Sequence, residues 1–165
     1  MDASDILDQV DVERIYGHVL RLEGTRHPID TPETLNKAAD YILSEFKQYG
    51  LAAKEQAFQV EGFPSTFRNI EARIEGGDEQ ELLVVSHYDT VENCPGADDN
   101  ASAIAVMLET ARVLTRTEDV GNTSFVSFTL EELSPAYLLK ARQIAQSLGL
   151  KDSRNRYTSM RTHET

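Results

Sequence analysis

A short apolar strand followed at once by an imidazole and several carboxylates limits what this chain can fold into. Residues 82–85 read Leu-Leu-Val-Val, which predicts a buried strand. The loop that follows carries His87, Asp89 and Asp99, and the apolar spacing over 101–116 then predicts a helix. Open α/β sheets bind their ligands at the carboxyl ends of strands. The sequence therefore predicts an α/β protein with a ligand site in this loop.

The residue types and their spacing suit a metal. His87 and Asp89 are two residues apart, so the carboxylate can hold one ring nitrogen while the other nitrogen binds an ion. Gly96 permits a tight turn that returns Asp99 toward His87. A Glu-Glu pair at 131–132 follows a second apolar strand. Each motif alone is typical of an ordinary strand end or helix cap, whereas the three together indicate a site.

These motifs resemble those of the zinc aminopeptidases of metallopeptidase family twenty-eight. The matching segments are His87-Tyr88-Asp89-Thr90, Pro95-Gly96-Ala97-Asp98-Asp99-Asn100-Ala101-Ser102 and Phe128-Thr129-Leu130-Glu131-Glu132. The resemblance extends more loosely from about residue 12 to residue 132. It implies an α/β fold with three layers, helix–sheet–helix, around a mixed, mostly parallel sheet, here in a truncated form.

The resemblance also implies a role for each site residue. In the complete family site two zinc ions share Asp99 as a bridge, with His87 on one ion and Glu132 on the other. Glu131 resembles the general base, which takes a proton from a metal-bridging water or hydroxide and passes it to the leaving amine. Asp89 resembles the residue that orients His87. The implied reaction removes N-terminal residues from peptides, and the peptide bond after Asp99 is expected to be cis.

Two further ligands of the family site, a later aspartate and a C-terminal histidine, have no evident counterpart after Glu132. We therefore interpret residues 1–165 as a single domain, the N-terminal part of a zinc aminopeptidase catalytic domain, with a polar tail at 151–165. We expect this chain to hold one zinc ion weakly or none, and to be inactive or incomplete by itself.

Two alternatives stay open. Metal-dependent carboxypeptidases and deacylases also combine His-x-Asp, a bridging aspartate and a Glu pair, although the segment 95–100 is more similar to the aminopeptidases. A degenerate, non-catalytic domain that binds metal weakly or serves as an interaction module would account for the missing ligands. The intact set of site residues argues against this second alternative, because no structural role requires all of them together.

The remaining pattern predicts alternating helices and strands. Helices are expected at 5–23, 31–50, 101–116 and 134–149, and strands at 51–60, 66–74, 81–86 and 123–130. The hydroxyl of Thr31 and the proline after it are expected to open the second helix. Because a helix separates the last two strands, these strands are expected to be parallel and to bring His87 near the Glu pair.

Charge and composition exclude several classes of function. With 28 acidic and 16 basic residues the chain has a formal net charge of −12, which argues against a nucleic-acid surface. The single Cys94 excludes an internal disulfide.

No segment has the pattern of a signal peptide or membrane span. A cytoplasmic location is therefore expected as the sequence stands, or export if the true N-terminus is missing. The expected partners are a peptide or aminoacyl substrate and a second copy bound through an uncovered sheet edge.

The other histidines and one arginine are not expected to take part. His18 lies on the first predicted helix, His27 stands beside a proline, and His163 lies in the polar tail, so none of them is predicted as a ligand. Arg26 is predicted to be a solvated loop charge.

Overall fold

The structure is a computed structural model of the chain, and it describes residues 3–60, 63, 65–77 and 80–133. The elements are α1 (Ala3–Leu7), α2 (Val12–Leu22), α3 (Pro32–Gln48), β1 (Ala52–Gln59), β2 (Thr66–Ile74), β3 (Glu81–His87), the π-helical segment η1 (Ala97–Ser102), α4 (Ala103–Leu114) and β4 (Asn122–Phe128). The helix predicted at 134–149 and the tail at 151–165 lie outside the described residues.

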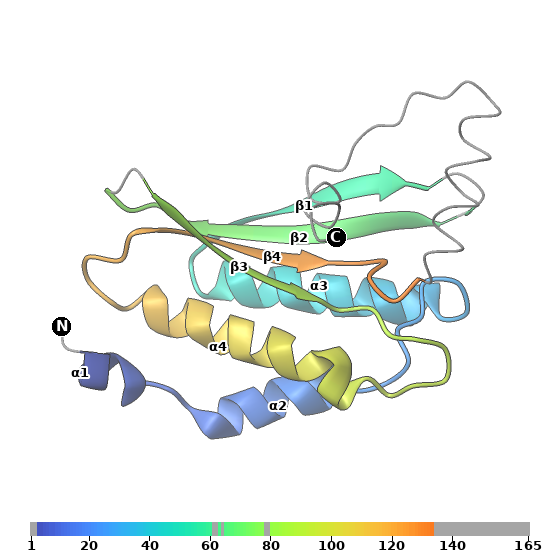
Figure 1. Cartoon of the computed structure of the whole chain (residues 1–165), viewed down its shortest axis with the longest axis horizontal. Coiled ribbons are helices and arrows are strands. Elements are labelled where there is room, and N and C mark those ends of the chain that lie inside the picture. The colour runs from blue at the N-terminus through green and yellow to red at the C-terminus, as the bar shows by residue number, and fades with distance from the viewer. Residues whose placement is uncertain (1–2, 61–62, 64, 78–79, 134–165) are drawn as a thin grey trace, which may run out of the picture.

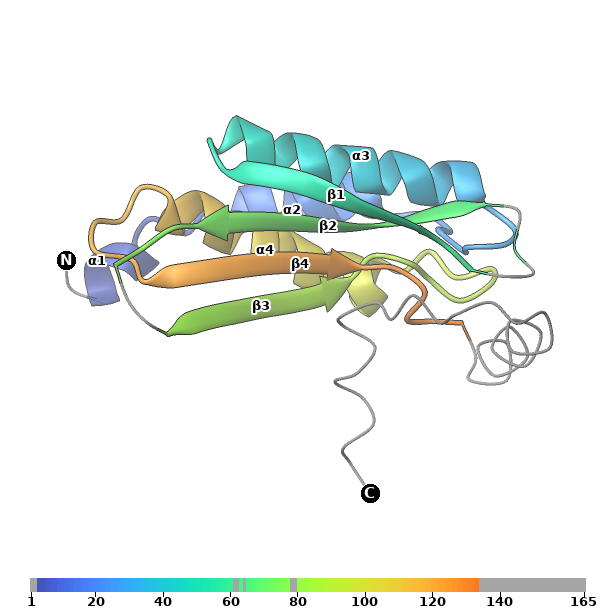
Figure 2. The same ribbon diagram turned by 90° about the horizontal axis from the view of Figure 1, so that it is seen from above.

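The described strands form one mixed sheet in the order β1-β2-β4-β3 (Figure 2). β3 and β4 are parallel and are connected through η1 and α4, as predicted. The pairs β1–β2 and β2–β4 are antiparallel. The prediction of a mixed α/β sheet is therefore confirmed, but parallel pairs do not predominate among the described strands. The reason is that a parallel pair needs a crossover helix, and only α4 provides one between neighbouring strands here.

The described helices cover one face of the sheet (Figures 1 and 2). α3 packs on β1 and β2, α4 packs on β3 and β4, and α2 packs against α4. The second helix layer of the expected three-layer arrangement is not found within 3–60, 63, 65–77 and 80–133. In that part of the chain the molecule has one sheet with helices on a single side.

The hydrophobic core lies between the sheet and α3 and α4. The ring of Phe46 on α3 lies 5.9 Å, centroid to centroid, from that of Phe125 on β4. Fully buried aliphatic side chains belong to the same core cluster as this pair, among them Ile42, Ile70, Ile104 and Leu108. Burying a side chain of this size stabilises the fold by about 1.5–3 kcal/mol. This packing holds α4 against the sheet and thereby fixes the loop that precedes it.

The N-terminal segment is not the single helix predicted at 5–23 but two helices, α1 and α2. The break occurs because the Asp11 carboxylate caps α2 and accepts from the backbone N–H groups of Glu13 and Arg14 at 3.0 and 3.2 Å. The N–H of Asp11 itself donates to Glu109 Oε1 at 2.7 Å, which ties the break to α4. Periodicity alone did not separate a capping aspartate from a polar residue within a helix.

The second helix begins as predicted, with Pro32 in its first turn, but Thr31 does not cap it through its side chain. The Thr31 hydroxyl instead donates to the Thr25 carbonyl at 3.0 Å and accepts from the His27 N–H at 2.8 Å. This closes the connector between α2 and α3 into a compact turn.

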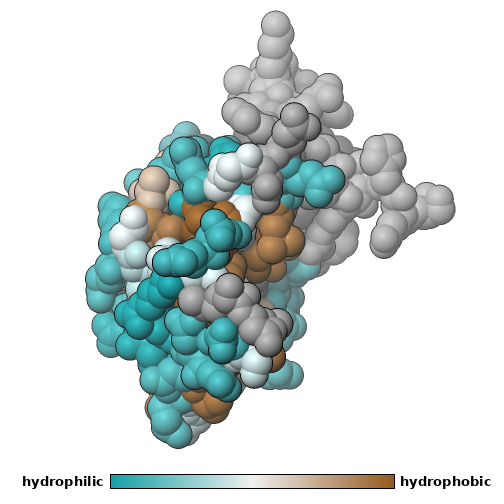
Figure 3. All heavy atoms as spheres, turned by 90° about the vertical axis from the view of Figure 1, so that its left-hand side faces the viewer, coloured by the Kyte–Doolittle hydropathy of each residue, from teal (hydrophilic) through white to brown (hydrophobic). Residues whose placement is uncertain are grey.

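The end of the molecule that faces left in Figure 1 has a mixed surface, with separate apolar areas among hydrophilic side chains (Figure 3). Leu7 and Leu82 are 69% and 60% exposed. None of the described helices has both the length and the apolar character needed to cross a membrane.

Candidate metal centre

The carboxyl ends of β3 and β4 bring two of the sequence motifs side by side. Because the two strands are parallel and in register, His87 lies opposite Phe128. The N–H of Tyr88 donates to the Phe128 carbonyl at 3.0 Å and continues this pairing past the end of β3. The residues after His87 and those after Phe128 therefore leave the sheet at the same end of the two strands.

The imidazole of His87 lies between two carboxylates. Its Nε2 is 3.1 Å from Asp99 Oδ1, and its Nδ1 is 3.6 Å from Asp89 Oδ1. The Asp89 side chain is fully buried, that of His87 is 12% exposed, and that of Asp99 is 69% exposed. The buried carboxylate thus stands behind the ring, and the exposed one stands on its solvent side.

Glu131 and Glu132 complete the group. One carboxylate oxygen of each residue and one ring nitrogen of His87 all lie within 4.8 Å of one another. Both carboxylates reach the same imidazole because β4 ends at Phe128, so the strict alternation of a strand no longer applies to them. The N–H of Glu132 donates to Asp89 Oδ2 at 2.9 Å, which fixes this segment to the buried carboxylate.

Asp99 reaches His87 through an unusual turn. Within η1, Asp99 has φ −112° and ψ 94°, which is not helical, and the peptide bond from Asp99 to Asn100 is cis, as predicted. Gly96, just before η1, has φ +57°, and a Cβ added there would lie 2.2 Å from Thr90 Cγ2. The predicted tight turn at Gly96 is confirmed, and it needs glycine for both reasons.

The electrostatics of the group are dominated by its negative charges. Burial lowers the pKa of His87, but the facing Asp89 carboxylate, with Glu131 and Asp99, more than offsets this effect and raises the pKa overall. Burial raises the pKa of Glu132, and the neighbouring Asp99 and Glu131 raise it further. A cation among these groups would relieve their mutual repulsion.

The donor atoms fit a zinc ion. Zinc binds histidine nitrogen and carboxylate oxygen at about 2.0–2.2 Å in tetrahedral geometry, so two ligand atoms stand about 3.3 Å apart. The 3.1 Å between His87 Nε2 and Asp99 Oδ1 agrees with this spacing. His87 Nδ1 and Asp89 Oδ1 are buried, and neither has a hydrogen-bond partner among the described residues. The two atoms face each other at 3.6 Å. A carboxylate behind a metal-binding imidazole holds the ring in its orientation.

Arg26 is not the solvated charge that was predicted. It is 1% exposed, and its guanidinium donates to backbone carbonyls of the loop that carries the site residues, including those of Tyr88 and Gly96. Burial lowers the pKa of Arg26, and the nearby Asp89 carboxylate opposes that change. No local pattern marks this residue, because the partners Tyr88 and Gly96 lie more than 60 residues further along the chain.

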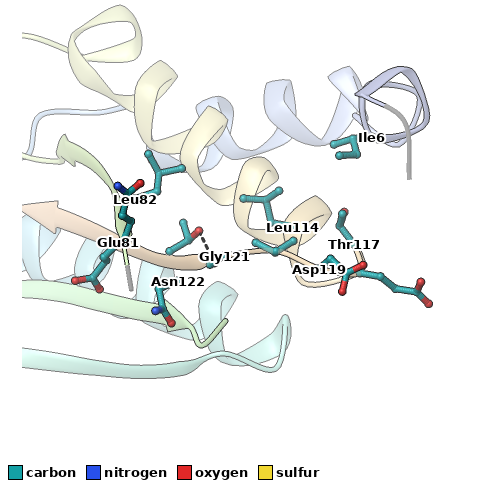
Figure 4. A pocket seen from close by; sticks show the side chains of 12 residues that line it. Ile6, Glu81, Leu82, Leu114, Thr117, Asp119, Gly121 and Asn122 are labelled. Atoms are coloured by element: carbon teal, nitrogen blue, oxygen red, sulfur yellow. Dashed lines mark hydrogen bonds between the residues drawn. The ribbon is translucent and has the colours of Figure 1, made fainter. Parts of the chain in front are cut away.

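The other described histidines lie outside the group. His18 is buried on α2, where its Nδ1 lies 2.6 Å from the Tyr41 hydroxyl, and His27 Nδ1 pairs with Asp30 at 2.7 Å. A cavity of about 590 Å³ lies where β3 and β4 begin, and Leu82, Leu114 and Asn122 are among its lining residues (Figure 4). It is at the opposite end of both strands from His87 and Glu131.

The parallel strand ends, the imidazole and the surrounding carboxylates form a candidate metal centre on an α/β fold. The family model for peptidase family M28 matches residues 69–160, and the chain belongs to this family.

Curated relatives agree with this assignment. The uncharacterized protein YfbL of Escherichia coli is 32% identical over 130 residues, covering 73% of this chain and 40% of the relative. A probable zinc metalloprotease of Pyrenophora tritici-repentis is 30% identical over 138 residues, covering 67% of this chain and 29% of the relative. Aminopeptidase YwaD of Bacillus subtilis is 48% identical over 52 residues, covering 32% of this chain and 11% of the relative. The chain spans at most 40% of the length of these relatives.

Solved structures share the fold. A glutaminyl cyclase of Porphyromonas gingivalis superposes with a TM-score of 0.61 at 28% identity, covering 73% of this chain and 46% of that one. A leucine aminopeptidase precursor of Bacteroides thetaiotaomicron gives a TM-score of 0.63 over 74% of this chain and 48% of that one. Its identity of 18% supports the fold alone.

Proposed function

We propose that this chain carries the zinc-binding part of a hydrolase of the aminopeptidase type, which cleaves N-terminal residues from peptides. The observation that carries the proposal is the cluster of His87, Glu131 and Glu132, whose possible ligand atoms all lie within 4.8 Å of one another. Asp99 Oδ1 stands beside this cluster, 3.1 Å from His87 Nε2. Membership in peptidase family M28 supports a peptide substrate.

In this proposal His87, Asp99 and Glu132 hold zinc, and Asp89 holds the His87 ring. A bound zinc ion would supply Lewis acidity and lower the pKa of water from 15.7 to about 7. Glu131 would act as the general base, which takes a proton from the attacking water and gives it to the leaving amine. The position of Glu131 beside His87 supports this role, because a base must lie within reach of the water that it activates.

We further propose that the 165-residue chain by itself holds one zinc ion weakly and turns over little or no substrate. His87 and Glu132 belong to different metals in the implied family arrangement, and two ions would need more protein ligands than the three assigned here. A cytoplasmic location of this chain is likewise a proposal, as is self-association through the edge of β3.

Metal binding by the full chain tests the proposal. After dialysis against zinc, we expect the wild-type chain to retain no more than about one ion, and His87→Ala to retain at least tenfold less at the same free zinc concentration. His27→Ala is the control, because His27 pairs with Asp30 outside the group, and it should bind as the wild type does. Equal binding by all three proteins would overturn the assignment of His87.

Turnover is tested on a panel of aminoacyl amides. Any release of N-terminal residues by the wild-type chain should disappear in Glu131→Gln, while that variant keeps the metal. Two tightly held zinc ions with robust activity would contradict the incomplete-site proposal and support a complete enzyme. An absence of both metal and turnover would favour the degenerate, non-catalytic alternative.

Cyclisation of N-terminal glutamine is a second candidate reaction, favoured by the 28% identity to the glutaminyl cyclase of Porphyromonas gingivalis. The two reactions differ in product, since cyclisation releases ammonia and leaves a pyroglutamyl end, whereas aminopeptidase action releases a free amino acid. A glutaminyl peptide therefore separates them in one assay. Ammonia without free glutamine would replace the aminopeptidase proposal by the cyclase one.

A further inference from the structure

Arg26 contacts both of the segments that carry the candidate metal centre. Its Nε donates to the Tyr88 carbonyl at 2.7 Å, and its Nη2 donates to the Gly96 carbonyl at 2.9 Å. Tyr88 directly follows His87, and Gly96 directly precedes the segment η1 that carries Asp99. One guanidinium therefore links the segments that carry His87 and Asp99, whose Nε2 and Oδ1 atoms are 3.1 Å apart.

Further hydrogen bonds attach the same residue to its surroundings. Nη1 donates to the carbonyls of Leu22 and of Gly24, the latter at 2.7 Å, and to that of Pro95 at 3.3 Å. The backbone N–H of Arg26 donates to Thr90 Oγ1 at 2.9 Å, and the Arg26 carbonyl accepts from the Thr90 N–H at 3.3 Å. Arg26 is thus held by the end of α2 and in turn holds the loop after β3.

The Gly96 carbonyl accepts two hydrogen bonds that connect Arg26 to the turn with Asp99. It accepts from Arg26 Nη2 and also from the N–H of Ala101 at 3.0 Å. Gly96 and Ala101 enclose the turn with Asp99, so the two ends of that turn meet at a carbonyl that Arg26 fixes. The buried guanidinium keeps its charge and its donors at any ordinary pH, because arginine is not deprotonated in proteins.

We propose that Arg26 is a positioning residue that sets the separation between His87 and Asp99 and thereby the affinity of the site for metal. The proposal rests on the proposed function in one respect, namely that His87 and Asp99 bind the metal. Arginine suits this task because its planar fork presents five donors in fixed directions, whereas lysine offers a single nitrogen. Arg26→Lys therefore keeps the charge but loses the simultaneous contacts to Tyr88 and Gly96.

The test is a titration of the full 165-residue chain with Co²⁺, whose visible absorption reports coordination geometry, followed by zinc competition. Arg26→Lys should weaken Co²⁺ binding about 10- to 100-fold, the usual effect of losing a residue that orients ligands, and should alter the absorption band. The matched control is Arg112→Lys, another buried arginine, which pairs with Glu109 at 2.6 Å on α4. This control should lower the unfolding temperature while cobalt affinity and spectrum stay as in the wild type.

A second readout needs no metal. In the metal-free chain, Arg26→Lys should speed hydrogen exchange at the amides of Thr90 and Ala101 by tenfold or more relative to the wild type, and Arg112→Lys should leave them unchanged. If Arg26→Lys does not fold, Thr90→Val removes the acceptor of the Arg26 backbone N–H, which ties the same residue to the loop, and Thr90→Ser restores the hydroxyl. Thr90→Val should then weaken cobalt binding and Thr90→Ser should recover it.

The outcomes separate this inference from the proposed function. Wild-type affinity, spectrum and exchange rates in Arg26→Lys would overturn the positioning role while the metal site stands. No cobalt binding by the wild-type chain would overturn the proposed function and the affinity effect together. Faster exchange only in Arg26→Lys would, in that case, still support the role of Arg26 in holding the loop.

Discussion

Asp89 connects two segments of the candidate metal centre through its two carboxylate oxygens. Oδ1 faces His87 Nδ1 at 3.6 Å, and Oδ2 accepts from the Glu132 N–H at 2.9 Å. Asp89→Asn keeps one oxygen for the Glu132 amide but removes the negative charge behind the imidazole. We expect zinc affinity to fall about 10- to 100-fold, measured by competition with a chelating dye. Asp40→Asn, which alters an exposed pair with Arg68, is the control and should leave affinity unchanged.

Glu109 makes a second residue-scale prediction, on pH. Burial raises its pKa, but hydrogen bonds from Arg112 and from the Asp11 N–H outweigh burial and hold the pKa below 4.5. A carboxylate with a lowered pKa stabilises the fold above its unfolded pKa, and this contribution disappears as the pH falls through the folded pKa. Glu109→Gln should therefore lower the free energy of unfolding at pH 7 by about 1–3 kcal/mol. Denaturant unfolding should show the gap between the two proteins narrowing from about pH 4.5 downward.

At the scale of elements, two glycines should respond oppositely to the same substitution. Gly96→Ala should destabilise the chain by about 1–3 kcal/mol, because φ is +57° and the new Cβ would meet Thr90 Cγ2 and the Asp99 carbonyl. Gly17 lies exposed within α2 with nothing within 4 Å of an added Cβ. Gly17→Ala should stabilise by up to about 1 kcal/mol. Thermal unfolding of both variants checks the signs, and a stabilised Gly96→Ala would contradict the strained turn.

Most element types could be predicted from the sequence because their signals are local. Proline and glycine mark the ends of α3, and alternating or continuous apolar runs mark β2, β3 and β4. The approach of Asp99 to His87 was predicted from the tight turn at Gly96, and that of the Glu pair from the parallel pairing of the last two strands. The burial of Arg26 could not be predicted, because the carbonyls of Tyr88, Pro95 and Gly96 reach it only in the tertiary fold. The break before α2 was missed because the partner of the Asp11 N–H lies on α4.

For the whole molecule, the parallel pair β3–β4 explains how the motifs meet. These strands end at the same edge, α4 holds their relative position from one face, and the donor atoms gather where the backbone leaves the sheet. The cavity at the opposite end of the strands shares none of these groups. The position of the site therefore follows from topology, and its detailed geometry follows from the loops and from Arg26.

The last prediction concerns the edge of the sheet. Among the described strands β3 pairs only with β4, and Leu82 and Val85 on it are 60% and 50% exposed. An uncovered apolar edge strand can pair with a second copy, and lysine on such an edge opposes pairing. Sedimentation velocity should show concentration-dependent self-association of the wild-type chain, with Val85→Lys shifted to monomer. Val106→Lys, at an equally exposed valine of α4, should associate as the wild type does. A monomeric wild type, or equal loss in both variants, would contradict association through β3.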